Sequence, residues 1–199
     1  MKFSSLLADD QAQVVIDTSV LVNIHACTYG LQILSAIPNR FMMPEIAADE
    51  LKEGTIERTF LESLVNVGVI EISALLDDEY EIFGELTSVS PTIDDGEAAT
   101  IAISYRRNIF PIIDDQRGRS RAAGLMPTLD PGWSLDLFRH PLVLTHLGDP
   151  NDIDALFLAL REGRMRIPID RREEVISLIG EERAVECTCL PGYKQRFGG

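Results

Sequence analysis

Through the first 125 residues, short apolar runs alternate with longer segments in which apolar residues recur with a helical period. The short runs are rich in β-branched residues and end at a polar residue, which is typical of buried strands. They predict strands at residues 13–17, 40–43, 67–72 and 109–113. The longer segments predict helices at residues 18–37, with a break near Gly30, and at 44–52, 55–66, 77–86, 96–107 and 116–123.

Strands that alternate with helices predict an α/β fold: a mainly parallel central sheet with helices on both faces, in three layers. The clearest helix is 96–107. Its predicted inner face has the spacing i, i+3, i+4, i+7 and consists of Ala98, Ile101, Ala102 and Tyr105.

From residue 134 the pattern is helical only, with helices predicted at 134–144, 152–161 and 171–179. We expect the last ten residues to be frayed or bound to a partner. The 199 residues therefore predict an α/β domain over residues 1–130 and a helical extension over residues 131–199. The extension is expected to pack on that domain or on a partner.

Four acidic segments occur where a predicted strand gives way to a helix or loop. They are Asp17, Glu50, the run Asp94 to Glu97, and the pair Asp114 and Asp115. Ligands of open parallel sheets bind beyond the carboxyl ends of the strands, so we expect these acids to converge there. Two carboxylates ~4 Å apart repel by ~1 kcal/mol in water and by ~4 kcal/mol at an effective dielectric constant of 20. A bound cation would remove that repulsion.

The ligand set contains only oxygen donors, which favours Mg²⁺ or Mn²⁺ over zinc, with one ion or two. A second interpretation treats the acids separately. Asp17 and either Asp94 or Asp95 would be helix caps, and Glu50 would be a surface acid.

The charge of the chain is unevenly distributed. The net charge is −14, and residues 1–100 carry all of it, with 18 Asp+Glu against 4 Lys+Arg. Residues 101–199 have 14 of each, and 15 of the 18 basic residues are Arg. An arginine cluster flanks the late acidic pair, and it consists of Arg106, Arg107, Arg117, Arg119 and Arg121. These side chains would either contact phosphates or form a solvated helix face.

The sequence also limits where the protein acts. No apolar run approaches the ~18 residues of a membrane span. The start of the chain meets two aspartates before an apolar segment develops, so we expect a cytoplasmic protein. The three cysteines are expected to be reduced thiols, because a closed zinc site needs four ligands.

Taken in order, the motifs V-I-D-T-S-V-L-V-N, M-P-E-I-A-A-D-E-L, D-D-G-E-A-A-T-I-A-I-S and F-P-I-I-D-D-Q-R-G-R resemble those of PIN-domain nucleases. The similarity is to the branch with a G-E-A helix and a D-D-x-x-G-R segment, and it covers residues 13–127. It implies the three-layer PIN-like fold and metal-dependent cleavage of RNA. It also implies a toxin of a toxin–antitoxin pair, with a small antitoxin as partner.

By this resemblance the catalytic acids are Asp17, Glu50, Glu97 and Asp115. Asp95 or Glu97 would be the third metal ligand, and Asp114 or Asp115 the fourth. Ser19 and Asn23 match positions that orient the first acid. Arg117, Arg119 and Arg106 would hold flanking phosphates.

Two other classes compete with this interpretation. One is a PIN-like nucleic-acid-binding or regulatory module with weak or no catalysis. The other is an α/β phosphatase or receiver protein, but Asp17-Thr18-Ser19 lacks the second aspartate of the phosphatase motif and lysines occur only at positions 2, 52 and 194. A homodimer is the expected oligomer.

Overall fold

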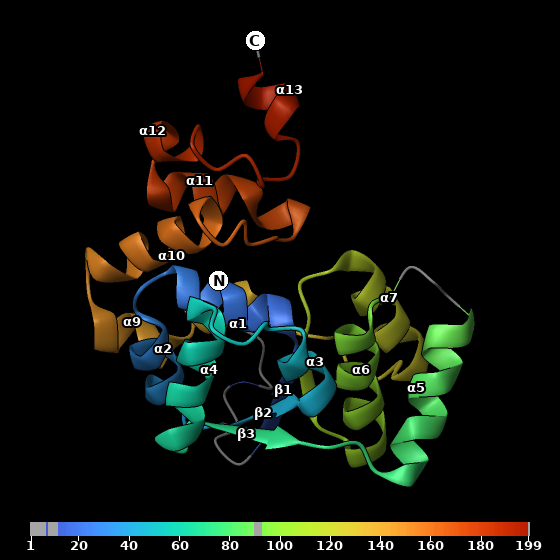
Figure 1. The fold of residues 1–199 in the computed structure, drawn as a ribbon. Helices are drawn as coiled ribbons and strands as arrows, with labels where there is room; N and C mark the ends of the chain where they lie inside the picture. Colours follow the sequence, from blue (N-terminus) through green and yellow to red (C-terminus); the bar gives the residue numbers. More distant parts are fainter. Residues whose placement is uncertain (1–6, 8–11, 90–92, 199) are drawn as a thin grey trace. The chain divides into compact units, whose positions relative to one another are not determined.

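The computed structural model describes residue 7 and residues 12–89 and 93–198 (Figure 1). Most of the N-terminal segment from which we expected a cytoplasmic protein lies outside these residues. The chain divides into two compact units. Unit 1 comprises Met1–Leu21 and Pro38–Gly132, and unit 2 comprises Val22–Ile37 and Trp133–Gly199. In this division, residues 22–37 group with the C-terminal helices, and the predicted boundary of a separate domain at residue 130 stays a prediction.

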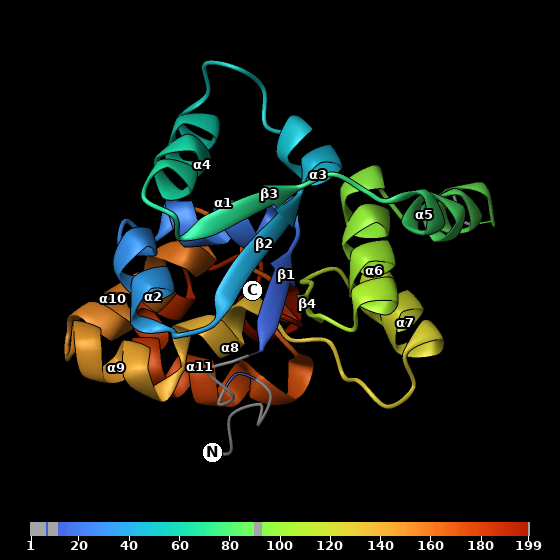
Figure 2. The same ribbon diagram turned by 90° about the horizontal axis from the view of Figure 1, so that it is seen from below.

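Unit 1 contains a four-stranded parallel sheet, which confirms the predicted fold class. Its strands are β1 (Gln13–Ile16), β2 (Arg40–Pro44), β3 (Ile70–Ser73) and β4 (Phe110–Ile112). They lie in the order β3-β2-β1-β4, as Figure 2 shows. Val14, Val15 and Ile16 are fully buried, as expected for the inner strand of a parallel sheet. Ile16 pairs with Ile112, so the carboxyl ends of β1 and β4 are level.

Helices follow the strands of unit 1 in alternation. They are α1 (Thr18–Ala26), which continues into unit 2, and α3 (Glu45–Asp49), α4 (Ile56–Asn66), α5 (Asp77–Val89), α6 (Asp95–Arg107) and α7 (Gln116–Leu125). All of them lie close to their predicted positions. β3 begins later than predicted because Gly68, at φ +74°, forms the turn that ends α4.

Helix α6 is the central helix of unit 1 and lies beside both α5 and α7 (Figures 1 and 2). One side of it packs in a cluster with residues of α5 and α7, through Ala98 and Ile101. The other side packs on the sheet, where Ala99 and Ile103 meet Val15. Because α6 is buried on two sides, its apolar residues cover more of its surface than the single stripe of a surface helix. Tyr105, predicted on the inner face, is instead 40% exposed.

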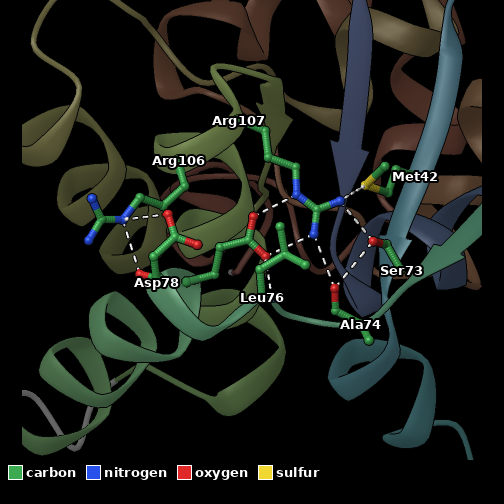
Figure 3. A network of polar contacts seen from close by, with 8 residues as sticks. Met42, Ser73, Ala74, Leu76, Asp78, Arg106 and Arg107 are labelled. Atoms are coloured by element: carbon green, nitrogen blue, oxygen red, sulfur yellow. Dashed lines mark hydrogen bonds and ion pairs between the residues drawn. The ribbon is translucent and has the colours of Figure 1, made fainter.

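An ion pair fixes the last turn of α6 to the start of α5 (Figure 3). Arg107 donates to both carboxylate oxygens of Glu79, at 2.6 and 2.8 Å, and also to Ser73 Oγ at 2.8 Å. The Glu79 side chain is fully buried. Burial raises its pKa, but the hydrogen bonds from Arg107 and from Leu76 N outweigh that effect, so the pKa lies below its usual value.

Unit 2 is helical. Besides most of α1 it contains α2 (Gly30–Ala36), α8 (Ser134–Phe138), α9 (Pro141–Leu147), α10 (Asn151–Arg161), η1 (Ile169–Arg171), α11 (Arg172–Ile179), α12 (Glu181–Ala184) and α13 (Tyr193–Phe197). The single helix predicted over residues 134–144 is wrong. His140 caps a new helix at Leu142 N, and Pro141 occupies its first position, where the missing N–H costs nothing. None of the helices in the described ranges is long and apolar enough to cross a bilayer.

The C-terminal tail is also more ordered than predicted. Residues 193–197 form α13, which is held by ion pairs from Arg196 to Glu173 and Glu181. Tyr193 adds a hydrogen bond from its hydroxyl to Val185 O at 2.6 Å. These partners lie on or beside α11 and α12, so the sequence of the tail alone could not reveal them.

A candidate acidic site at the carboxyl edge of the sheet

Asp17 and Asp114 are the most deeply buried acids of the site. Asp17 follows β1 directly and caps α1, because its Oδ1 accepts a hydrogen bond from Val20 N at 2.9 Å. Ser19 Oγ donates to the same oxygen at 2.9 Å. The pKa of Asp17 is raised to about 8, chiefly by burial and then by the charges of Asp114 and, more weakly, Asp94, which together outweigh these hydrogen bonds. A cation bound in place of the proton would therefore stabilise the ionised carboxylate of Asp17.

Glu50 joins the loop after α3 to the starts of two other helices. Its Oε2 accepts from Thr18 Oγ1 at 2.6 Å, and its Oε1 accepts from Gly96 N at 2.9 Å. The N-terminus of α6 attracts this carboxylate through its unpaired N–H groups. A Cβ at Gly96 would lie only 2.7 Å from Glu50 Oε1, so glycine is required for this approach.

The acidic run before α6 divides into two roles. Asp94 caps the helix by accepting from Glu97 N at 2.7 Å, and it is exposed, as is Asp95. Glu97 is buried, and its carboxylate lies against the first turns of α7. A Cβ at Gly118 would come within 3.2 Å of Glu97 Oε2. Asp95 and Glu97 thus differ sharply in burial.

The pair after β4 divides in the same way. Asp114 is buried, and its charge acts on Asp17. Asp115 is partly exposed and caps α7 by accepting from Arg117 N at 2.8 Å. Successive residues at the end of a strand point to opposite sides, which explains the difference.

We call the set Asp17, Glu50, Asp94, Asp95, Glu97 and Asp114 the acidic edge. Beside it lies an open hollow of about 610 Å³, lined by Ile46, Asp49, Glu50, Asp94 and Asp95. Across the part of the chain that the structure describes, no three His, Cys, Asp or Glu side chains are gathered as ready ligands for a metal ion. Asp17, Glu50 and Asp94 each accept a hydrogen bond at a helix N-terminus. Asp17 and Asp94 therefore act as helix caps, and a shared acidic site stays a prediction.

The donor set nevertheless fits a hard divalent cation. All six side chains offer carboxylate oxygens, the donors that Mg²⁺ and Mn²⁺ prefer. Two of the acids, Asp17 and Asp114, are buried, and the charge of Asp114 adds to the larger effect of burial in raising the pKa of Asp17. Gly96 and Gly118 leave room for carboxylates where a side chain would fill the space.

Two of the three predicted phosphate-binding arginines are engaged by the protein itself. Arg106 lies in the last turn of α6, at the opposite end from Glu97, and pairs with Glu81 at 3.4 Å. Arg119 is buried and donates to Gly132 O at 2.6 Å, which fixes the segment that runs beside β4. Only Arg117 of the three is exposed near the acidic edge, in the first turn of α7.

Asn23, predicted to help orient the first acid, lies on α1 within unit 2 and is buried. Its Nδ2 donates to Ser134 Oγ at 3.5 Å. A Cβ at Gly163 would lie 2.8 Å from Asn23 Oδ1. These contacts give Asn23 a packing role between α1 and the helices of unit 2.

Sequence reasoning missed Thr18, Gly96 and Gly118 as members of the site. A glycine inside a helix weakens it, so its presence indicates a packing or functional reason. Gly96 and Gly118 both lie within helices and both approach a carboxylate. That signal could have identified them before the structure was seen.

Comparison with known proteins supports one family. Residues 13–129, more than half of the chain, match a family profile described as a PIN domain. Searches of curated proteins and of solved structures gave no significant match. PIN domains are generally nucleases and typically use divalent metal ions. The matched residues contain all four strands and the whole acidic edge, and the chain therefore belongs to the PIN-domain family.

Proposed function

We propose that this protein is a divalent-metal-dependent ribonuclease whose active site is the acidic edge. The observation that carries the proposal is the burial of Asp17 beside Asp114 at the carboxyl edge of the sheet. Two buried carboxyl groups held close together destabilise the metal-free protein. Function is the simplest reason for a fold to retain such an arrangement.

Asp17, Glu97 and Asp114 would hold the ion, because they are the buried acids of the edge. Glu50 and Asp95 would complete the site from the open hollow. We thus favour Asp114 over Asp115 and Glu97 over Asp95 as inner ligands. A bound divalent ion supplies positive charge for the phosphate and lowers the pKa of the attacking water.

The protein's own side chains have defined tasks in this proposal. Ser19 orients the Asp17 carboxylate through its hydrogen bond. Thr18 and Gly96 hold Glu50 at the rim of the site. Arg117, which is exposed on α7, would contact a flanking phosphate. Unit 1 carries 21 Asp+Glu against 9 Lys+Arg and would repel RNA without such positive charges.

The test is cleavage of single-stranded RNA by the purified protein with Mn²⁺, with Mg²⁺ and with EDTA. We expect cleavage only with a metal, and its loss in Asp17→Asn and Asp114→Asn. Asp49→Asn is the matched control, because Asp49 lines the hollow with a 70% exposed side chain. Wild-type cleavage by Asp17→Asn would refute the assignment.

One observation favours a second function, that of a catalytically weak nucleic-acid-binding module. Three of the carboxylates are already engaged at helix N-termini, and no ready ligand group exists in the described ranges. Metal-independent RNA binding without any cleavage would support this alternative.

The sequence resemblance supports two further parts of the proposal, an RNA rather than DNA substrate and a toxin role with a small antitoxin. A cytoplasmic location is proposed from the start of the sequence, and a homodimer because it is the commonest oligomer. Expression of the wild-type protein and of Asp17→Asn in bacteria tests the toxin role, since only the former should arrest growth.

A further inference from the structure

We propose that Arg119 is a positioning residue of the acidic edge, and that it holds Asp114 and Glu97 where a metal ion would bind. This role rests on the proposed ribonuclease function, because it concerns the support of two of its inner ligands. It also replaces the phosphate contact that the sequence resemblance implies for Arg119. All the residues involved belong to unit 1.

Arg119 links the end of β4 to the segment that follows α7. Its Nη1 donates to Ile113 O at 3.3 Å and to Gly132 O at 2.6 Å. The two carbonyl groups belong to backbone segments that also bind each other. Ile113 N donates to Gly132 O at 3.1 Å, and Gly132 N donates to Pro111 O at 2.9 Å. The guanidinium therefore fixes the backbone directly before Asp114.

The same arginine belongs to the first turn of α7, which lies against Glu97. Arg119 N donates to Asp115 O at 3.0 Å within this turn. Gly118, the preceding residue, packs between two parts of the site. An added Cβ there would lie 3.0 Å from Ile113 Cγ2 and 3.2 Å from Glu97 Oε2. A displacement of this turn would therefore change the space that is left for the Glu97 carboxylate.

The burial of Arg119 favours a positioning role over a phosphate contact. Its side chain is only 9% exposed, whereas Arg117 in the same turn is exposed. Burying a guanidinium costs free energy unless acceptors replace its lost hydration. An apolar side chain of similar volume would fill the same space without that cost. The retained charge indicates that its hydrogen bonds to the backbone beside Asp114 have a use.

The ion pair of Arg119 contributes little by comparison. Its Nη2 lies 3.3 Å from Asp130 Oδ1, but the Asp130 side chain is 93% exposed. Ion pairs with such exposed groups add little stability. The backbone contacts of Arg119 are therefore the ones that the test must separate.

The test is the dissociation constant for Mn²⁺, measured by isothermal titration calorimetry without RNA. Loss of a residue that supports a metal ligand lowers metal affinity by about 10–100-fold. We expect Arg119→Leu to raise the dissociation constant at least about tenfold. Arg119→Lys keeps a donor for Gly132 O and should raise it less. Circular dichroism at the same temperature shows whether each variant is folded.

Two controls separate positioning from a general loss of stability. Arg107→Met weakens unit 1 at the opposite end of α6 and should leave the dissociation constant for Mn²⁺ unchanged. Asp130→Asn removes only the exposed partner of Arg119 and should also leave it unchanged.

A further variant covers the case in which Arg119→Leu does not fold. In Gly132→Ala the added Cβ would lie 2.9 Å from Phe110 Cε1, so the segment would move away from β4. This variant keeps Arg119 itself and should still weaken the binding of Mn²⁺.

The phosphate role is tested by the salt dependence of RNA binding in EDTA, measured by fluorescence anisotropy with a labelled single-stranded RNA. Each lost phosphate contact lowers the slope of log K against log salt by about 0.7. We expect that fall for Arg117→Gln and no change for Arg119→Lys or Arg119→Leu. An equal fall in Arg119→Leu, with unchanged binding of Mn²⁺, would overturn the positioning role.

Unchanged binding of Mn²⁺ in both Arg119→Leu and Gly132→Ala would overturn it as well, while the ribonuclease proposal remains. A wild type that binds no Mn²⁺ would refute both proposals. If the binding of Mn²⁺ depends on Arg119 but the wild type never cleaves RNA, the ribonuclease proposal alone fails.

Discussion

Replacing Asp17 by asparagine should stabilise the metal-free protein, by an amount that grows with pH. In the unfolded chain Asp17 loses its proton near its ordinary pKa of 3.8, whereas in the folded protein it keeps the proton up to about pH 8. A group whose pKa is raised by folding favours the folded state at low pH. That contribution is lost as the pH rises from about 4 to about 8.

The magnitude follows from the pKa difference. Each pH unit between the two values changes the free energy of unfolding by ~1.4 kcal/mol. Between pH 4 and pH 7 the wild type would lose up to ~4 kcal/mol through this single group. Water penetration and relaxation reduce the cost of a buried charge, so we expect Asp17→Asn to exceed the wild type by about 2–4 kcal/mol at pH 7. Asparagine keeps the oxygen that accepts from Val20 N.

Urea denaturation in EDTA at several pH values measures this difference, with the midpoint urea concentration and the m value compared between the two proteins. Asp49→Asn, which removes the same formal charge from an exposed position, should show no such growth with pH. The reasoning is wrong if Asp17→Asn is less stable than the wild type at pH 7, or if its advantage is the same at pH 4 and pH 7.

Three further predictions use the same structure. Mn²⁺ should raise the Tm of the wild type but not of Asp17→Asn, because ligand binding stabilises only a protein that can bind it; equal shifts in both would contradict the metal site. Gly118→Ala should reduce cleavage, because its Cβ would crowd the Glu97 carboxylate. Gly124→Ala lies in the same helix with open space around it, so it should leave cleavage unchanged and add up to about 1 kcal/mol of stability. Arg107→Met should lower the free energy of unfolding in urea by about 3–5 kcal/mol, because it leaves the buried Glu79 carboxylate unpaired. Loss of Arg106 from its exposed ion pairs should lower it by at most about 1 kcal/mol. Similar losses in both variants would disprove the importance of burial.

The sequence alone predicted a mainly parallel sheet and the alternation of strands and helices along the chain, whereas the order of the strands in the sheet came from the structure. β-Branched runs such as V-V-I favour a buried strand, and the positions of most helices followed from period and capping residues. The sequence also predicts that the acids converge at one edge of the sheet, and this convergence stays a prediction. These features are local, so a short window of sequence contains the information that specifies them.

Only the tertiary structure decided which of two neighbouring acids is buried. Asp114 rather than Asp115, and Glu97 rather than Asp95, faces the interior. The choice depends on the direction in which each strand or helix leaves the sheet, and one residue of register reverses it. The approach of Glu50 to Gly96 likewise joins residues that are distant in sequence.

The arginines show the same limit most clearly. In the sequence, Arg106, Arg117 and Arg119 form one basic cluster. In the structure, Arg106 pairs with Glu81 and Arg119 binds Gly132 O, while Arg117 remains exposed. The charge pattern of the sequence sets the number and the sign of these charges. Their long flexible side chains, however, reach partners that the fold brings from elsewhere in the chain. Their partners, and hence which of them can meet a phosphate, depended on packing.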